Sequence, residues 1–270
     1  MKQIAEHNEK PELMALYNIC FPGEEDYCKR FFDCVWEPAK TLVYKTDGKI
    51  VSMLHMIDIT ITDGCEEYSA YYIFGAATHP DYRGKSVMRE LLQYSEEINC
   101  RKDFAVLIAG NDGLTEYYGR SGYQIGFSCG KRLIRSSVSH VPHQMFDFSK
   151  LSLKESEKVL DKMNDIYLKS FGSEVICKRT PELLFSDLYC REAVVFMADN
   201  CYAVAEISND EIVFAECAGE NSTVLASYVL YERGLTEGAA YTSGSDISLG
   251  MYKNIACKKA VKGYLNLLFN

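Results

Sequence analysis

The sequence lacks the features that mark several classes of protein. No apolar run approaches the length of a membrane-spanning helix, and the opening residues MKQIAEHNEKPELM are charged where a secretory signal would be apolar. Neither G-x-x-x-x-G-K-[ST] nor G-x-G-x-x-G occurs, which excludes two common nucleotide-binding turns. We therefore expect neither a membrane protein nor a P-loop or dinucleotide-binding enzyme.

An excess of basic residues is also missing. The net charge is −9 and the acidity is evenly spread: residues 1–135 hold 16 Lys and Arg against 20 Asp and Glu, and residues 136–270 hold 13 against 18. Neither half is therefore a basic module for nucleic acid. The acidic surface serves solubility, with a mild preference for a cationic substrate.

Cysteines with metal-binding spacing are missing as well. The eleven cysteines are scattered and odd in number, and no C-x-x-C pair occurs among them. We expect a cytoplasmic protein with reduced thiols, most of them buried as small apolar side chains, and no metal site.

The first half shows alternating signals for helices and strands. The strongest short-range signal is Asp47-Gly48, which predicts a hairpin turn between two β-rich runs. In chain order we expect two helices (10–21 and 24–36), the hairpin (41–62), a strand (68–78), a turn leading to an amphipathic helix with Val87, Met88, Leu91, Leu92 and Ile98 on one face, a buried strand (103–110), a short helix (113–123) and a final strand pair (124–135).

The second half partly repeats this order after a linker at 136–150. The expected elements are a helix with a capping box at Ser152 and Glu155 (151–171), a meander of three strands turning at Asp199-Asn200 and Asn209-Asp210 (192–219), a helix (221–234) and two strands (239–243 and 263–270). No Arg-Gly element precedes the helix at 221–234. The predicted fold class is α/β (α+β), with a mixed central sheet in two copies, residues 1–135 and a degenerate 151–270.

The stretch HPDYRGKSVMRELL, residues 79–92, predicts a phosphate-binding turn. A strand runs into it and a helix leaves it, so unpaired backbone N–H groups at the helix N-terminus point at whatever lies above them. Gly84 and Ser86 keep the side chains small, and Arg83 can neutralise phosphate charge. Asn111 follows the next strand, and Tyr118 lies on the short helix after it. This order suits a ligand with a pyrophosphate at one end and a reactive group at the other.

Residues 68–126 resemble the acyl-coenzyme-A-binding core of the GNAT family of N-acetyltransferases. The family turn [QR]-x-x-G-x-[GA] falls on residues 83–88, with Ser86 where the family has glycine and Met88 where it has glycine or alanine. A second motif, asparagine followed by an aromatic-Tyr-x-[KR]-x-Gly-aromatic run, falls on Asn111 and on YYGRSGY, residues 117–123. The whole order is most similar to the enhanced-intracellular-survival type, whose further sterol-carrier-like domain we do not expect in this chain.

The resemblance implies a site and a reaction. The reaction would be direct transfer of an acetyl group from acetyl-CoA to a primary amine in a ternary complex, with Tyr118 protonating the departing thiolate and Asn111 contacting the arm near the thioester. The acceptor would be a small molecule or a lysine-like group; association of further copies of the chain stays open. The residues implied to hold the cofactor are Ala76, Ala77 and Thr78 along the pantetheine arm, and Arg83, Gly84, Lys85, Ser86, Val87 and Met88 around the pyrophosphate.

Two alternatives stay open. The chain could instead be an acyl-CoA-binding regulatory protein without turnover, which Ser86 and Met88 favour and Asn111 and Tyr118 oppose. The general base is also open. His55, Asp58, Glu66 and Glu67 are candidates, and for each we expect surface solvation instead. We do not expect a cysteine nucleophile, because no family signature marks one.

Overall fold

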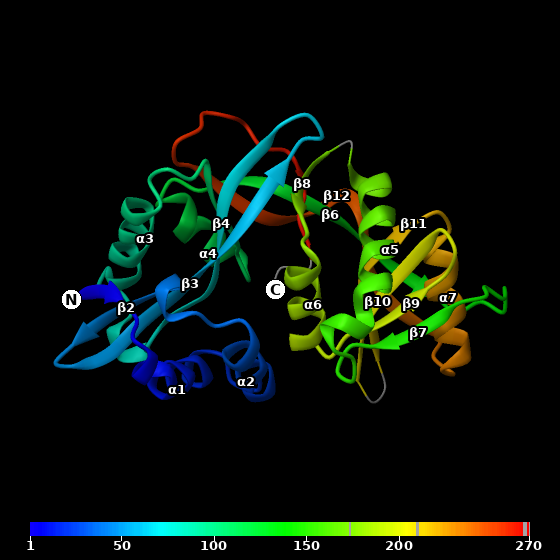
Figure 1. Cartoon of the computed structure of the whole chain (residues 1–270), viewed down its shortest axis with the longest axis horizontal. Helices are drawn as coiled ribbons and strands as arrows, with labels where there is room; N and C mark the ends of the chain where they lie inside the picture. Colours follow the sequence, from blue (N-terminus) through cyan, green and yellow to red (C-terminus); the bar gives the residue numbers. More distant parts are fainter. Residues whose placement is uncertain (173, 209–210, 267–268, 270) are drawn as a thin grey trace. The chain divides into compact units, whose positions relative to one another are not determined.

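The protein divides into two compact units, each with mixed strands and helices packed on them, seen in a computed structural model (Figure 1) that describes residues 1–172, 174–208, 211–266 and 269. The first unit comprises Met1–Ile61, Tyr68–Ile125 and Gly250–Ala260. The second comprises Thr62–Glu67, Gly126–Leu249 and Val261–Asn270. Within the described residues, no helix is both long and apolar enough to span a membrane.

The elements of the first half follow the predicted order. Asp47 and Gly48 turn the hairpin with positive φ angles of 51° and 79°, as the Asp-Gly signal predicts. A short first strand was not predicted. The elements are β1 (Lys2–Ile4), α1 (Lys10–Cys20), α2 (Glu25–Cys34), β2 (Thr41–Thr46), β3 (Lys49–Thr62), β4 (Glu67–Thr78), α3 (Val87–Ile98), β5 (Phe104–Ile108) and α4 (Asp112–Gly119).

Strands of the first unit are ordered β1-β2-β3-β4-β5, and the end of β12 (Glu237–Asn254) lies beside β5. β4 and β5 are parallel, and their pairing runs only from Ala70–Phe104 to Ile73–Leu107. β4 continues to Thr78 beyond the last pair. The two central strands therefore diverge toward their carboxyl ends.

Two different cores cover the faces of this sheet. On one face, aliphatic and aromatic side chains of β3, β4 and β5 pack with α3 and α4, including Leu54, Ile73 and Leu91. On the other face, Phe31 of α2 lies with its ring centre 4.6 Å from that of Phe74 on β4 and 5.0 Å from that of His55 on β3. Aromatic packing therefore fixes α2 against β3 and β4.

From residue 124 onward the structure departs from the prediction at several points. The strand pair expected at 124–135 is wrong, because β6 (Gln124–Arg135) is one continuous strand. The 136–150 linker contains a strand, and a helix and a strand between 175 and 190 were missed. The turn predicted at Asn209-Asp210 lies outside the described residues. The elements are β7 (Gln144–Asp147), α5 (Leu153–Phe171), β8 (Val175–Lys178), α6 (Pro181–Cys190), β9 (Val194–Met197), β10 (Cys201–Ile207), β11 (Ile212–Gly219), α7 (Ser222–Glu232), β12 and β13 (Gly263–Tyr264).

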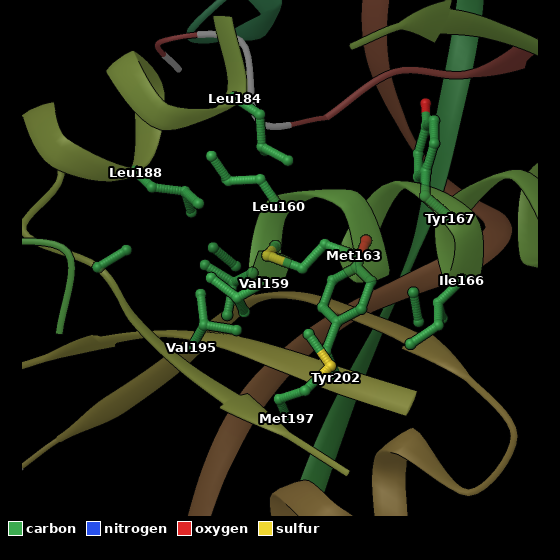
Figure 2. Close-up of a cluster of buried hydrophobic side chains, with 14 of the residues drawn as sticks. Val159, Leu160, Met163, Ile166, Tyr167, Leu184, Leu188, Val195, Met197 and Tyr202 are labelled. Atoms are coloured by element: carbon green, nitrogen blue, oxygen red, sulfur yellow. The ribbon is translucent and has the colours of Figure 1, made fainter. Parts of the chain in front are cut away.

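The second unit repeats the core order of the first. β9, β10 and β11 form an antiparallel meander, α7 follows, and β12 returns parallel to β11, just as β5 returns parallel to β4 after α3. The predicted capping box of α5 is present at Ser152 and Glu155. Figure 2 shows the apolar face of α5, including Leu160 and Met163, directed at α6 and at the strands that carry Val195 and Tyr202. α7 packs on a second core cluster of the same meander.

Each half of the sequence contributes strand residues to the unit that the other half mainly forms. Most of β6 belongs to the second unit, where it lies between β13 and β12. In return, residues 250–254 of β12 pair antiparallel with β5 in the first unit. The prediction placed 124–135 with the first half and expected a strand of only five residues at 239–243, because local patterning does not show which sheet a strand joins.

A buried ion pair ties the second unit together. Arg179, which follows β8, donates two hydrogen bonds of 2.8 and 2.6 Å to Glu216 on β11. The same carboxylate accepts from Tyr202 at 2.5 Å and from Tyr264 at 2.9 Å. The Arg179 guanidinium lies 3.5 Å from the ring centre of Tyr167 on α5. One carboxylate thus joins β8, β10, β11 and β13.

We predict that Glu216→Gln lowers the free energy of unfolding by about 3–5 kcal/mol, because it leaves the Arg179 guanidinium buried without a counter-ion. Glu206→Gln is the matched control. Glu206 pairs with Arg191 at 2.6 Å, but its side chain is 39% exposed, so the loss should stay below about 1 kcal/mol. Urea denaturation of both variants measures the difference; equal losses would contradict the importance of the buried pair.

Candidate functional site

The carboxyl end of β4 offers main-chain groups that β5 does not pair. The β4–β5 ladder ends at Ile73, five residues before β4 does. On its other side this end is held in place: the Ser52 hydroxyl on β3 donates to the carbonyl of Ala77 at 2.8 Å and contacts the Thr78 hydroxyl at 2.8 Å. Ala76, Ala77 and Thr78 therefore form a fixed, half-paired edge.

The turn after β4 ends in a left-handed residue. Gly84 has a φ of 74° and Ser86, the N-cap of α3, has a φ of 61° and a ψ of 9°. The Ser86 side chain does not cap the helix. The first N–H groups of α3 therefore have no acceptor inside the helix and remain available to a ligand. The left-handed backbone also explains why glycine would suit position 86, since L-residues are strained there.

A cavity of about 830 Å³ brings the predicted residues together. Ten of the eleven line it, from the end of β4, the turn, the start of α3 and both ends of α4. Lys85 does not; its ammonium lies 4.8 Å from the ring centre of Tyr82. The lining residues that were predicted are Ala76, Ala77, Thr78, Arg83, Gly84, Ser86, Val87, Met88, Asn111 and Tyr118.

The charge of this cavity has one sign. Arg83, Arg89 and Arg120 line it, and no Asp or Glu is among the described residues that do. Arg83 Nε donates to the Thr78 carbonyl at 3.1 Å, which holds the guanidinium at the turn. In a protein of net charge −9, three arginines without a carboxylate indicate an anionic ligand.

Sequence reasoning missed Arg89 and Arg120. A signal existed for Arg120, because it occupies the [KR] position of the motif that Tyr117–Tyr123 matches. No motif marks Arg89, and the only indication in the sequence was its place in the first turn of α3. Its charge enters the site only because the helix starts at the turn.

Asn111 and Tyr118 lie at opposite ends of α4. The Asn111 side-chain oxygen caps the helix by accepting from the Leu114 N–H at 3.0 Å, which leaves its amide nitrogen to donate. Tyr118 is 7% exposed, and its ring centre lies 5.4 Å from Tyr117 and 5.9 Å from Tyr123. Burial, with a smaller effect of Tyr117, raises the pKa of Tyr118 to about 12, so its hydroxyl stays protonated at neutral pH.

None of the four general-base candidates lines this cavity. Asp58 is paired with Lys102 at 2.8 Å and with Lys40, and Glu67 with Lys178 at 2.7 Å. Burial raises the pKa of Asp58, but the two lysines outweigh it and hold that pKa below its usual range. The surface role expected for His55 is wrong, because His55 is 2% exposed inside the aromatic core.

The second unit has a cavity of similar size but of mixed charge. Its volume is about 890 Å³, and Arg132, Lys162 and Lys169 are balanced by Asp165, Asp199 and Glu220. The N-cap of α7, Asn221, is left-handed like Ser86, with a φ of 64°. Only Glu220 and Asn221 separate β11 from α7, whereas eight residues separate β4 from α3. The connection in the second unit is therefore too short for a turn like that of residues 79–86, and we take the cavity of the first unit as the candidate site.

The diverging strands β4 and β5 and the open N-terminus of α3 lie within the part of the chain that a family model matches. Residues 3–126 match the family model described as an acetyltransferase (GNAT) domain. Residues 3–126 are therefore a GNAT acetyltransferase domain. Among curated proteins, no sequence matches the chain.

Solved structures share the fold over almost the whole chain. A protein from Enterococcus faecalis V583, described as a probable N-acyltransferase, is 14% identical with a TM-score of 0.71, covering 94% of this chain and 72% of that chain. Eis1 from Mycobacterium abscessus is 11% identical with a TM-score of 0.63, covering 95% and 74%. N-myristoyltransferase from Saccharomyces cerevisiae, solved with myristoyl-CoA, is 11% identical with a TM-score of 0.59, covering 96% and 80%. At these identities the likenesses show the fold alone.

We predict that Ser86→Gly raises the free energy of unfolding by about 1 kcal/mol, because glycine adopts the left-handed conformation without strain. Lys85→Gly is the control. The backbone at Lys85 is not left-handed, so glycine should only add entropy to the unfolded chain and lower stability. Thermal and chemical denaturation measure both; a destabilised Ser86→Gly would show that the serine side chain has a role beyond the turn.

We predict that His55 makes the protein sensitive to acid. Burial lowers the pKa of His55 from 6.5 to about 3. Between those values the unfolded chain binds a proton at His55 and the folded chain does not, so this residue's contribution to stability falls as pH drops, by about 1.4 kcal/mol per pH unit. His55→Phe should remove that slope between pH 6.5 and 4, whereas His140→Phe, at an exposed site, should keep it. Identical slopes in all three proteins would refute the prediction.

Proposed function

We propose that the protein is an N-acetyltransferase that transfers an acetyl group from acetyl-CoA to a primary amine. The observation that carries the proposal is the cavity of the first unit, in which three arginines and the open N-terminus of α3 meet the half-paired end of β4. Each part suits a different portion of an acyl-CoA. The GNAT domain match and the yeast neighbour with myristoyl-CoA support an acyl-CoA as the donor.

The residues of the cavity fit such a ligand chemically. Free N–H groups of α3, together with Arg83 and Arg89, would bind the pyrophosphate. The amide-bearing pantetheine arm would pair with the main chain of Ala76, Ala77 and Thr78, as an added strand does. Ser86 leaves room for this approach because its short side chain follows a left-handed backbone.

Tyr118 would act on the leaving group. Bound acetyl-CoA supplies an acyl group activated as a thioester. The amine nitrogen forms the new C–N bond as the C–S bond breaks, Tyr118 gives its phenolic proton to the sulfur, and the proton released by the nitrogen restores the phenol through solvent. A tyrosine whose pKa is about 12 is fully protonated before the step, as a general acid must be. Asn111 would hold the arm near the thioester through its free amide nitrogen.

The wider setting belongs to the same proposal. We propose a cytoplasmic enzyme whose acceptor is a small molecule or a lysine-like amine, with residues 1–135 as the catalytic domain, 136–150 as a linker and 151–270 as the degenerate second domain. The balanced charges of the second cavity support a second half without cofactor.

The test is a titration with acetyl-CoA by calorimetry, followed by an assay of free thiol release across a panel of primary amines. Binding together with amine-dependent thiol release supports the proposal. Binding without release by any amine would instead favour an acyl-CoA-binding regulatory protein. Absence of binding would refute both.

We predict that Tyr118→Phe lowers kcat on the order of 10²–10⁴-fold when the chemical step is limiting, with little change in acetyl-CoA affinity, because only the proton donor is lost. Tyr123→Phe is the matched control. The Tyr123 ring neighbours Tyr118, is 3% exposed, and its buried hydroxyl has no hydrogen-bond partner among the described residues. Tyr123→Phe should therefore keep normal turnover. Near-normal kcat in Tyr118→Phe would assign the proton to another group or to water.

A further inference from the structure

The cavity of the second unit, about 890 Å³ in volume, is built around a closely packed strand end. β11 ends at Gly219, whose N–H donates to the Ser170 hydroxyl on α5 at 3.0 Å, and that hydroxyl donates to the Ile166 carbonyl at 2.8 Å. Gly219 has a φ of 91°, and a side-chain carbon there would lie 2.7 Å from Cα of Cys201 and 2.9 Å from Cγ2 of Ile166. The end of β11 is therefore fixed against α5, on which Figure 2 shows Ile166.

Beside this strand end, α7 begins with an open N-terminus. The N–H groups of Val224 and Leu225 both donate to the Asn221 carbonyl, at 2.9 and 3.0 Å, and the Asn221 side chain does not cap the helix. The main-chain N–H groups of Ser222 and Thr223 have no acceptor among the described residues. Both residues line the cavity, so two free donors and the positive end of the helix dipole border it.

The Ser222 hydroxyl is a third donor without a partner. The residue is 7% exposed and lines the cavity, and its side chain makes no hydrogen bond to the described part of the chain. Ser227, the next serine on α7, donates to the Thr223 carbonyl at 2.9 Å and does not line the cavity. Buried hydroxyls are normally satisfied in this way. Ser222 therefore points to an acceptor that the described chain does not supply.

Charges of both signs surround the same space without neutralising each other. The charged residues that line it are Arg132, Lys162, Lys169, Asp165, Asp199 and Glu220. None of the six forms an ion pair with a described residue. Asp165 and Lys169 are unpaired although they lie four residues apart on α5, a spacing at which helix side chains can meet. Unpaired charges of both signs suit a ligand that carries both an anionic and a cationic group.

One edge of β11 is unpaired where it borders the cavity. β11 pairs with β12 only as far as Phe214, although it continues to Gly219. Asn266 donates to the Ala215 carbonyl at 2.6 Å, but from Cys217 onward no described strand pairs with this edge. The residues from there to the end of the strand line the cavity. Such an edge suits an extended ligand with amide groups, which binds as an added strand does.

We infer that this cavity is a second ligand site and binds a short peptide with both termini free. The peptide carboxylate accepts from the N–H groups of Ser222 and Thr223 and from the Ser222 hydroxyl. Its ammonium group pairs with Asp165 and Asp199, and its amides bind the edge of β11. A carboxylate carries a single negative charge, so the neighbouring Glu220 opposes it less than it would oppose a phosphate. The site belongs to the second unit alone and does not depend on the proposed function.

Calorimetry of the full chain with L-alanyl-L-alanine tests the class of ligand, and we expect saturable binding. N-acetyl-alanyl-alanine lacks the ammonium group and alanyl-alanine amide lacks the carboxylate, so each should bind about tenfold more weakly or worse. Equal affinity for either analogue would overturn the assignment. So would an absence of binding both by alanyl-alanine and by a panel of longer unblocked peptides.

Two variants of α7 test the location of the site. Ser222→Ala should raise the Kd of alanyl-alanine about tenfold, because a hydrogen bond to a charged group is lost. Ser227→Ala is the matched control, since it removes a hydroxyl from the same helix outside the cavity lining, and it should leave the Kd unchanged. The same Kd in wild type and Ser222→Ala would contradict the site.

Replacing the two aspartates separates a binding role from a structural one. Asp165→Asn combined with Asp199→Asn should remove most of the preference for alanyl-alanine over its N-acetyl form, because only the unblocked peptide has an ammonium group to lose its partners. Both side chains are exposed, so this variant also serves if Ser222→Ala fails to fold. An unchanged preference for the unblocked peptide would refute the proposal.

Discussion

The end of pairing between β4 and β5 is the constraint on which the site depends. As long as two parallel strands stay paired, their main-chain groups satisfy each other and leave nothing for a ligand. Here the ladder stops at Ile73 and Leu107, and β4 runs on to Thr78 with one edge unpaired. The Ser52 hydroxyl holds the opposite side of that edge. The cavity, the open start of α3 and the ends of α4 all border the gap that this divergence creates.

The second unit shows the same strand-to-helix order with a different connection. Its helix α7 starts at a left-handed N-cap, as α3 does, so the strand-to-helix geometry is retained. The connection consists of Glu220 and Asn221, and the Glu220 carboxylate lines the cavity of this unit, whereas Arg83 and Gly84 line that of the first. A negative charge at a helix N-terminus is favourable in itself but repels phosphate. Geometry alone therefore does not make the site; the length and the charge of the turn decide it.

Sequence patterns predicted the local elements well, because periodicity and turn residues report short-range structure. The Asp47-Gly48 hairpin, the capping box at Ser152 and the helix starting after Ser86 were all correct. Patterns failed where long-range pairing decides the outcome: β6 was split in two, and β12 was read as five residues instead of eighteen. Most of the site residues could be predicted because two motifs, at 83–88 and at Asn111 with 117–123, place them in sequence. His55 was misread, since nothing in its neighbours reveals that α2 covers it with aromatic rings.

Strand exchange gives the second half of the sequence a structural role in the first unit. β5 is buried on both faces and needs a partner on each edge. β4 supplies one, and Gly250–Asn254 of β12 supplies the other. Lys253 in that segment also pairs with Glu96 of α3 at 2.7 Å, which ties the helix that starts at Ser86 to the same strand. The first unit is thus completed by residues 250–254, and the geometry at the cavity depends on a half of the sequence whose described residues do not line it.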